Sequence, residues 1–185
     1  MFAERGYAAA SIDEIARRAG VSAPILYDHF ASKLDLHGRL LERTRDELLA
    51  MWREALATDA PDEERFPLAI DAWARYVEAN PYAARMFFRE TTGDPEAIAV
   101  HQRVLTESQA SLGEILGGEQ AGEPVALEMA AVVMRSGLTG LAIWWLDHPE
   151  VTREQIVATS VNAIWVGFER VRRGELWQPG STLSP

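Results

Sequence analysis

A stretch near the N-terminus, residues 6–33, constrains the fold of this chain more than any other part. Ser11 stands three residues before Glu14, which is the spacing of a capping box at the start of a helix. Gly20 can adopt the left-handed conformation that ends such a helix, and Ser22 is placed to cap a second helix directly afterwards. The pattern therefore predicts two short helices joined by a tight turn, which is a helix-turn-helix.

A helix-turn-helix can place the outer face of its second helix in the major groove of DNA while the first helix lies over the backbone. Helical hairpins of this size also occur as plain packing units, so the spacing alone leaves both interpretations open. The residue identities favour DNA binding, because the stretch resembles the DNA-binding segment of the TetR family of transcriptional regulators. The residues that match this family in type and spacing are Phe2, Gly6, Tyr7, Ile15, Ala16, Gly20, Val21, Ser22, Leu26, Tyr27, His29, Phe30, Ser32 and Lys33.

The resemblance implies an all-α protein with a three-helix helix-turn-helix DNA-binding head and a larger helical body that binds a ligand and dimerises. Family members usually begin with a longer first helix, so we expect this chain to lack the start of that helix. Ala10 and Ala23 stand where Thr and a basic residue are common in the family. These two departures predict a lower affinity for DNA and leave the expected fold unchanged.

Eight residues are candidates for contact with DNA. We expect Tyr27, His29 and Lys33 to project to the DNA backbone, whereas Ala23, Pro24 and Ile25 would face base edges. An apolar side chain at Ile25 could touch a thymine methyl group. Packing is the alternative role for Tyr27, and a solvated helix end is the alternative for His29. The full candidate set is Ser11, Ser22, Ala23, Pro24, Ile25, Tyr27, His29 and Lys33.

The distribution of charge bears on how strongly such a head could bind DNA. The 185-residue chain has a net charge of −10 at pH 7, yet residues 1–45 hold seven basic and six acidic side chains. The excess negative charge therefore lies in the remainder of the chain. Modest non-specific affinity for DNA is expected, because few phosphates can be neutralised. The chain contains no cysteine and shows no secretory leader pattern, which favours a cytoplasmic location.

Beyond residue 33 the apolar residues recur at helical spacing, and no run alternates convincingly with period two. The expected helices run from about 34 to 56, 67 to 78, 81 to 92, 95 to 116, 129 to 146 and 152 to 171. The polar stretch 117–123 is expected to be a flexible loop. We divide the chain into a DNA-binding domain, the head (1–45), and an effector-binding and dimerisation domain, the body (46–185).

The last two expected helices are the most apolar part of the chain. Residues 129–146 contain a single charge, Arg135, and are nearly long enough to span a bilayer. A central Arg and several small residues favour burial in protein over a membrane. Small residues on a second stripe predict a four-helix dimer interface, which the resemblance also implies; one larger core is the alternative. The candidate interface residues are Gly137, Gly140, Trp144, Ile156, Ser160, Ala163 and Gly167.

Residues from several helices of the body are candidates for an effector site, although an aromatic or Met stripe more often forms core. Arg135 stands out, since a charge within an apolar helix must find a partner. A structural acid, Glu90 or Glu107, is one candidate partner, and an anionic ligand is the other. The candidate ligand-binding residues are Trp73, Tyr76, Met86, Phe87, Val104, Ser108, Met134, Arg135 and Leu138.

Motifs for catalysis are missing from the sequence. The four His residues are scattered without metal-ligand spacing, and neither a phosphate-binding Gly-rich loop nor a Gly-x-Ser-x-Gly elbow occurs. We therefore expect no cofactor, no metal site and no enzyme. The prediction is a ligand-released repressor of TetR type that binds operator DNA as a homodimer and takes a small apolar effector. A helical interaction or ligand-binding module that has lost DNA binding is the main alternative, and a ferritin-like enzyme is the third.

Overall fold

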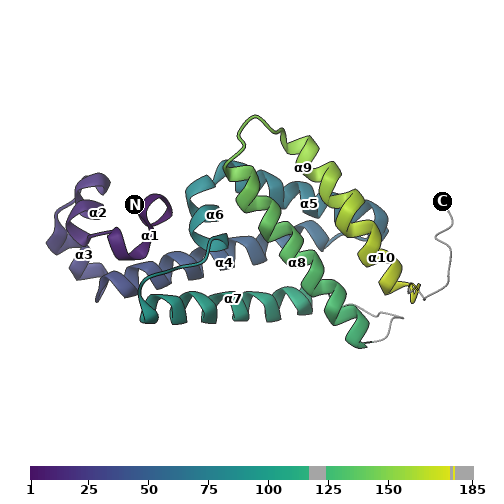
Figure 1. Cartoon of the computed structure of the whole chain (residues 1–185), viewed down its shortest axis with the longest axis horizontal. Helices are drawn as coiled ribbons and strands as arrows, with labels where there is room; N and C mark the ends of the chain where they lie inside the picture. The colour runs from purple at the N-terminus through teal and green to yellow at the C-terminus, as the bar shows by residue number, and fades with distance from the viewer. Residues whose placement is uncertain (117–123, 176, 178–185) are drawn as a thin grey trace.

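The computed structural model describes residues 1–116, 124–175 and 177, and all the regular elements in this part of the chain are helices (Figure 1). The elements are α1 (Phe2–Ala9), α2 (Ile12–Ala19), α3 (Ala23–His29), α4 (Lys33–Leu56), α5 (Asp62–Ala79), α6 (Pro81–Phe88), α7 (Pro95–Leu116), α8 (Pro124–Leu146), α9 (Arg153–Ser160), the π-helical turn η1 (Val161–Trp165) and α10 (Val166–Arg172). The all-α prediction is confirmed. The loop expected at 117–123 lies outside the described residues.

The helix ends of the head follow the capping signals with one exception. The Ser11 hydroxyl accepts a hydrogen bond from the backbone N–H of Glu14 at 3.2 Å, and Ser32 caps α4 in the same way. Gly20 ends α2 in the left-handed conformation, with φ of 72°. Ser22 occupies the N-cap position of α3, but no backbone N–H of this fully described helix donates to its side chain. Its hydroxyl is therefore not consumed by capping.

The head has a small hydrophobic core of its own. α1 is kinked at Gly6, whose φ of 76° requires a residue without a Cβ. This kink turns the aromatic side chains on either side of it toward α4. The buried residues of the head core are Phe2, Tyr7, Ala10, Ile12 and Leu36, joined by Ala97 from α7.

α4 connects the head to the body as one continuous helix. Figure 1 shows it running from the three short helices along the body beside α7, with α5, α9 and α10 above and α8 crossing obliquely. In the body core, Trp73 and Trp145 are buried, and the rings of Phe66 and Trp165 stack with centroids 4.0 Å apart. The core of the body and the core of the head therefore share α4 as their common support.

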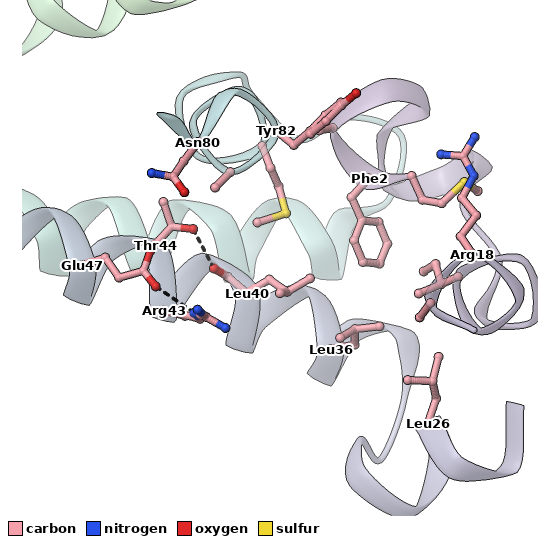
Figure 2. A pocket seen from close by; sticks show the side chains of 16 residues that line it. Phe2, Arg18, Leu26, Leu36, Leu40, Arg43, Thr44, Glu47, Asn80 and Tyr82 are labelled. Carbon is pink, nitrogen blue, oxygen red and sulfur yellow. Dashed lines mark hydrogen bonds and ion pairs between the residues drawn. The ribbon is translucent and has the colours of Figure 1, made fainter. Parts of the chain in front are cut away.

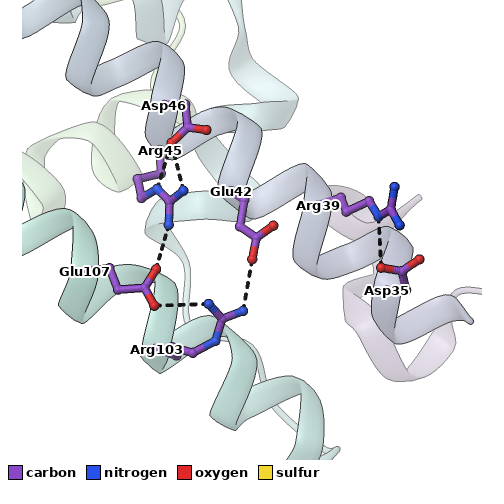
Figure 3. Close-up of polar contacts among 7 residues, drawn as sticks. All are labelled: Asp35, Arg39, Glu42, Arg45, Asp46, Arg103 and Glu107. Atoms are coloured by element: carbon purple, nitrogen blue, oxygen red, sulfur yellow. Dashed lines mark hydrogen bonds and ion pairs between the residues drawn. The ribbon is translucent and has the colours of Figure 1, made fainter. Parts of the chain in front are cut away.

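An ion-pair network joins α4 to α7 (Figure 3). Arg45 bonds to Glu107 at 2.6 Å, and Arg103 bonds to Glu107 at 3.1 Å and to Glu42 at 3.0 Å. Single pairs at a surface contribute about 0–1 kcal/mol, but here two arginines share one carboxylate across two helices. The network fixes α7 against the part of α4 that enters the body.

α5 begins earlier than predicted. It starts at Asp62, whereas the sequence pattern placed the start at Pro67. The carbonyl of Pro61 accepts hydrogen bonds from the N–H groups of Glu64 and Arg65 at 2.9 and 3.1 Å, so the first turn is complete before Pro67. That proline lies inside the helix, where its missing N–H leaves one backbone bond unmade.

Three further boundaries follow from local chemistry. α6 ends at Phe88, about four residues before the predicted end, because the next residue takes an extended conformation. The Asp94 carboxylate accepts the Ala97 N–H at 3.0 Å and so caps α7. A capping box between Thr152 and Gln155 is present at the start of α9. The predicted end of α6 was thus wrong, as was the predicted start of α5.

α8 has the length and composition of a membrane-spanning helix over Glu128–Leu146, with a mean hydropathy of 1.4. In this structure it packs against α6, α9 and α10. A Cβ on Gly137 would lie 2.8 Å from Cδ1 of Ile164, so this glycine lets α8 approach the last helices closely. Gly137 therefore serves packing within the chain, and its assignment to an intermolecular interface is corrected.

Candidate functional site

α3 presents an exposed surface on the outside of the head. None of its seven residues is fully buried. Ile25 and Tyr27 are 44% and 57% exposed, and Pro24, His29 and the N-cap residue Ser22 are also exposed. The five side chains are therefore accessible to a groove of DNA, as the helix-turn-helix prediction requires.

Three other candidate DNA contacts interact with other parts of the head instead. The Ser11 oxygen caps α2, and Ala23 is half-buried against the head core. The ammonium of Lys33 donates to the carbonyls of Tyr7 and Ala10 at 3.1 Å each and lies 4.2 Å from the centre of the Tyr7 ring. The prediction that Lys33 projects to the DNA backbone is wrong, because this ammonium binds the C-terminal end of α1.

The basic side chains of the head are largely paired with its own acids. Arg5 bonds to both carboxylate oxygens of Glu14 at 3.0 and 3.1 Å, and Arg18 pairs with Glu4. Hydrogen bonding to Arg18 holds the pKa of the Glu4 carboxyl below its ordinary value. Arg17 on α2 is 74% exposed and lies 3.7 Å from Glu14. The head therefore has few positive charges to offer to phosphates, in line with modest non-specific binding.

An open groove of about 590 Å³ separates part of the head from the body (Figure 2). Ile15 and Leu26 line it from α2 and α3, Leu40 lines it from α4, and Tyr82 and Met86 line it from α6. Met86 was predicted to bind ligand, yet it packs against both hydrophobic cores at this groove. The head and the body therefore meet over a limited area, with an unfilled space beside it.

A smaller cavity of about 90 Å³ lies within the body. It brings together five of the nine candidate ligand-binding residues, from α5, α6, α7 and α8. These five are Trp73, Phe87, Ser108, Arg135 and Leu138. Sequence reasoning missed the wall that α4 supplies, because the spacing of apolar residues does not reveal which neighbours a helix meets. The residues missed are Leu48, Leu49 and Trp52 from α4, with Phe88, Gln109, Leu112 and Thr139.

Arg135 is the charged residue that lines this cavity, and its Nε is buried without a hydrogen-bond partner. Burial lowers the pKa of its guanidinium, and the charge of Glu128 opposes that shift. Glu107 is engaged by two arginines of the α4–α7 network. Within the residues that the structure describes, neither Glu107 nor Glu90 forms an ion pair with Arg135, so these two acids are not its partners.

Three more candidates do not line the cavity. The Tyr76 hydroxyl donates to Glu47 at 2.8 Å, and its burial raises the pKa of the phenol. Val104 and Met134 are buried in the hydrophobic core. These side chains share helical stripes with the cavity residues but point to a neighbouring layer of the core, which helical spacing alone does not resolve.

The predicted interface residues divide into two groups. Gly140, Trp144, Ala163 and Gly167 are exposed, and neither Gly140 nor Gly167 has an atom within 4 Å of an added Cβ. Ile156 and Ser160 are instead fully buried, so their assignment to an interface is corrected. The exposed apolar side chains around the first group are Val125, Met129, Val132, Val133, Trp144 and Val166. They form an apolar face on α8 and the last helices, which we call the α8 face.

Comparisons with known proteins agree with this architecture. The family model described as bacterial regulatory proteins, tetR family, matches residues 1–40. The transcriptional activator FasR of Mycolicibacterium smegmatis is 31% identical over 173 residues, which cover 92% of this chain and 79% of FasR. The transcriptional repressor KstR2 of Mycobacterium tuberculosis is 42% identical over 65 residues, 35% of this chain and 32% of KstR2.

The fold also matches solved structures. FadR of Bacillus subtilis, crystallised in complex with stearoyl-CoA, is similar with a TM-score of 0.71. The match covers 94% of this chain and 92% of FadR at 20% sequence identity. FadR of Bacillus halodurans has the same TM-score at 18% identity. The likeness therefore extends over both the head and the helical body.

Proposed function

Because this chain belongs to the TetR family of bacterial transcriptional regulators, we propose that residues 1–45 read operator DNA and that residues 46–185 dimerise and bind a small effector. It is a regulator and not an enzyme. The α8 face supplies the dimer contact, and the protein acts in the cytoplasm. The exposed residues of α3, namely Pro24, Ile25, Tyr27 and His29, contact the DNA together with Ser22.

The effector is an apolar molecule with one acidic group. The observation that carries this proposal is the buried, unpartnered Nε of Arg135 at the wall of an otherwise largely apolar cavity. A buried guanidinium nitrogen without a hydrogen-bond partner is costly, and an anionic ligand group that accepts from it removes that cost. FadR of Bacillus subtilis holds stearoyl-CoA, a ligand with a long apolar chain and an anionic carrier. That ligand has the combination of properties that this cavity favours.

Ligand binding must change the shape of the body. The cavity of about 90 Å³ is well below the roughly 300–1,000 Å³ typical of small-molecule sites. A ligand therefore has to displace the walls, which gives the filled and empty states different geometries. In a dimer, the two α3 helices bind successive major grooves only when they are about 34 Å apart. Ligand releases DNA because it has higher affinity for a state with another spacing.

The experiment uses dodecanoate and dodecanol as matched probes, which differ in the acidic group. Dodecanoate should quench tryptophan emission, raise the melting temperature and release DNA with one common midpoint after allowance for linkage. Arg135→Met should weaken dodecanoate binding by about tenfold or more and leave dodecanol binding nearly unchanged. Arg75→Met is the control, because Arg75 is exposed and pairs with Asp71 on its own helix. Equal losses for both probes would contradict an acidic-group site.

Repression is the output we propose, and activation is the second candidate. The observation that favours activation is that FasR, which matches over most of this chain, is an activator, whereas the match to the repressor KstR2 covers 35% of it. A reporter driven by the DNA upstream of this gene decides between them. Deleting the gene should raise reporter output for a repressor and lower it for an activator.

The remaining alternative is a helical module that has lost DNA binding. The paired arginines of the head are the observation in its favour. Footprinting on the DNA that flanks the gene tests it directly. A protected pseudo-palindrome whose occupancy falls with salt supports the DNA-binding regulator. An absence of binding even at low salt contradicts it and favours the module that has lost DNA binding.

A further inference from the structure

A chain of polar contacts begins at the wall of the effector cavity. The side chain of Phe87 lines the cavity, and its backbone carbonyl lies 2.9 Å from Nε2 of His101 on α7. The other ring nitrogen of His101, Nδ1, accepts the backbone N–H of Thr91 at 3.1 Å. His101 and Phe87 are both buried. The ring of His101 therefore ties the end of α6 to the segment between α6 and α7.

The partners of His101 determine where its proton lies. A backbone carbonyl only accepts hydrogen bonds, so Nε2 must carry the proton that is donated to Phe87. The N–H of Thr91 only donates, so Nδ1 must offer its lone pair. Both nitrogens are used, each with one fixed role. Any movement of the Phe87 carbonyl therefore changes the position of Thr91 or breaks one of the two bonds.

The second half of the chain of contacts reaches the head. The Thr91 hydroxyl lies 3.4 Å from Nε2 of His37 on α4. His37 is 2% exposed, and its ring packs against Phe2 at 5.0 Å and Tyr7 at 5.1 Å between centroids. Both aromatic residues belong to α1 and to the head core. The ring of His37 is thus a shared part of the head core and of the polar link to the body.

The head side of this link is itself bonded to α4. The carbonyl of Tyr7 accepts a bond from Lys33, which begins α4. A shift of the His37 ring therefore acts on α1. The aromatic side chains of this helix and the carbonyl groups at its C-terminal end contact α4 and so hold the head in place. The open groove beside this junction (Figure 2) leaves space for the head to change its inclination.

We propose that Phe87, His101, Thr91 and His37 form a relay that couples effector binding in the body to the orientation of the DNA-binding head. The relay deepens the proposed function and rests on it. A ligand too large for the empty cavity moves the Phe87 wall, which breaks or lengthens the bond from His101. Thr91 then releases Nε2 of His37, and the head loses one of the contacts that set its position relative to the body.

The test removes the link without removing the rings. His37→Phe keeps an aromatic ring between Phe2 and Tyr7 but deletes Nε2, and Thr91→Val deletes only the hydroxyl. Thr106→Val is the matched control, because its hydroxyl on α7 bonds to the carbonyl of Gln102 within the same helix. Affinity for the upstream DNA fragment is measured with and without saturating dodecanoate, together with the affinity for dodecanoate alone.

The ratio of the two DNA affinities is the readout. Coupling between sites is typically about 5- to 150-fold, and both relay variants should reduce it to within about threefold of unity. Without ligand they already lack the contact that ligand breaks, so they should bind DNA about as weakly as the liganded wild type. The Thr106→Val control should keep the full ratio. Thr91→Ser restores the hydroxyl and should restore most of the coupling. The His37→Phe/Thr91→Val double variant should lose no more coupling than either single variant, since all three remove the same contact.

Two failures are distinguishable. If dodecanoate does not change the DNA affinity of the wild type, the proposed function fails, and the relay falls with it. If the wild type responds and the folded relay variants respond equally, the relay is overturned while the regulator stands. Amide hydrogen exchange at Thr91 gives an independent check, because dodecanoate should accelerate it in the wild type. Unchanged exchange in a protein that releases DNA would also overturn the relay.

Discussion

At the scale of single residues, two cations show how tertiary context decides a role. Lys33 closely follows α3 in the sequence, but its ammonium donates to two backbone carbonyls at the end of α1 and lies over the ring of Tyr7. Arg135 lies in the middle of the most apolar helix, and its Nε finds no partner there. The sequence predicted a DNA contact for Lys33 and a ligand contact for Arg135. Only the packing of segments distant in sequence shows that Lys33 is bonded within the head whereas the Arg135 Nε has no partner.

Lys33→Met is expected to lower the stability of the folded protein, with no direct effect on its affinity for DNA. The substitution keeps the apolar stem and removes a charged donor from two carbonyls, and hydrogen bonds to charged groups contribute about 1.5–3 kcal/mol. Urea denaturation should show a loss of about that size. Arg39→Met, which removes an exposed pair with Asp35 on the same helix, should cost under about 0.5 kcal/mol. A stable Lys33→Met protein with weaker DNA binding would restore the phosphate-contact interpretation.

His37 should make stability fall as the pH drops. Burial, together with the electrostatic effects of the neighbouring His101 and Lys33, lowers the pKa of His37 to about 4 in the folded state, against about 6.5 in the unfolded chain. Above pH 6.5 the ring is neutral in both states, so its contribution is complete. Between pH 6.5 and 4 the unfolded state takes up a proton that the folded state does not, and stability is lost. The pH dependence of His37→Phe should therefore be flatter in urea titrations from pH 7 to 4.5, and parallel curves would rule this out.

At the scale of helices, the sequence was informative about where elements begin and end. Ser11 caps α2 and Gly20 ends it as predicted, because caps are local chemistry. Apolar stripes along a helix were less informative about which residues are buried. Ile156 shares a helical face with residues that are exposed, yet it is buried, since a stripe does not reveal which neighbour it meets. The cavity wall from α4 was missed for the same reason.

In the proposed function, operator choice depends on α3. Ile25→Ala should change the preference among operator sequences while non-specific affinity and its salt dependence stay constant, because an apolar contact to a base edge carries sequence information and a phosphate contact does not. Leu68→Ala serves as the control, since Leu68 is exposed on α5 in the body. Selection from a randomised DNA pool measures the preference. Identical selected sequences for the wild type and Ile25→Ala would place the reading residues elsewhere.

The α8 face is tested by two glycines with the same local surroundings. A Cβ on Gly167 or on Gly113 meets no atom within 4 Å, so a single chain tolerates a large side chain at either place. Gly167→Trp should nevertheless dissociate the dimer, because overpacking costs about 1–3 kcal/mol in each protomer. Gly113→Trp on α7 should remain dimeric. Light scattering gives the masses, and a wild-type mass of one chain at micromolar concentration would disprove the dimer.

At the scale of the whole molecule, charge and architecture act in opposite directions. The net charge of −10 repels DNA, and the head compensates little because its arginines are paired internally. In the proposed dimer, specific binding relies on two heads placed correctly at once, a condition that one head cannot meet. Such a dependence makes DNA binding sensitive to small changes in the body. From the near-neutral balance of residues 1–45, the sequence predicted only modest non-specific affinity.

The continuity of α4 restricts how this protein can be recombined with its relatives. One inserted residue in an α-helix turns everything beyond it by about 100° and advances it by about 1.5 Å. The number of residues between Leu36 in the head core and Leu48 in the body core thus sets how far α3 is rotated about the axis of α4 relative to the body. A chimera joined inside α4 with that number unchanged should recognise the donor's operator under the control of this body. Adding a single alanine at the seam should abolish operator binding in band-shift assays while leaving both halves folded.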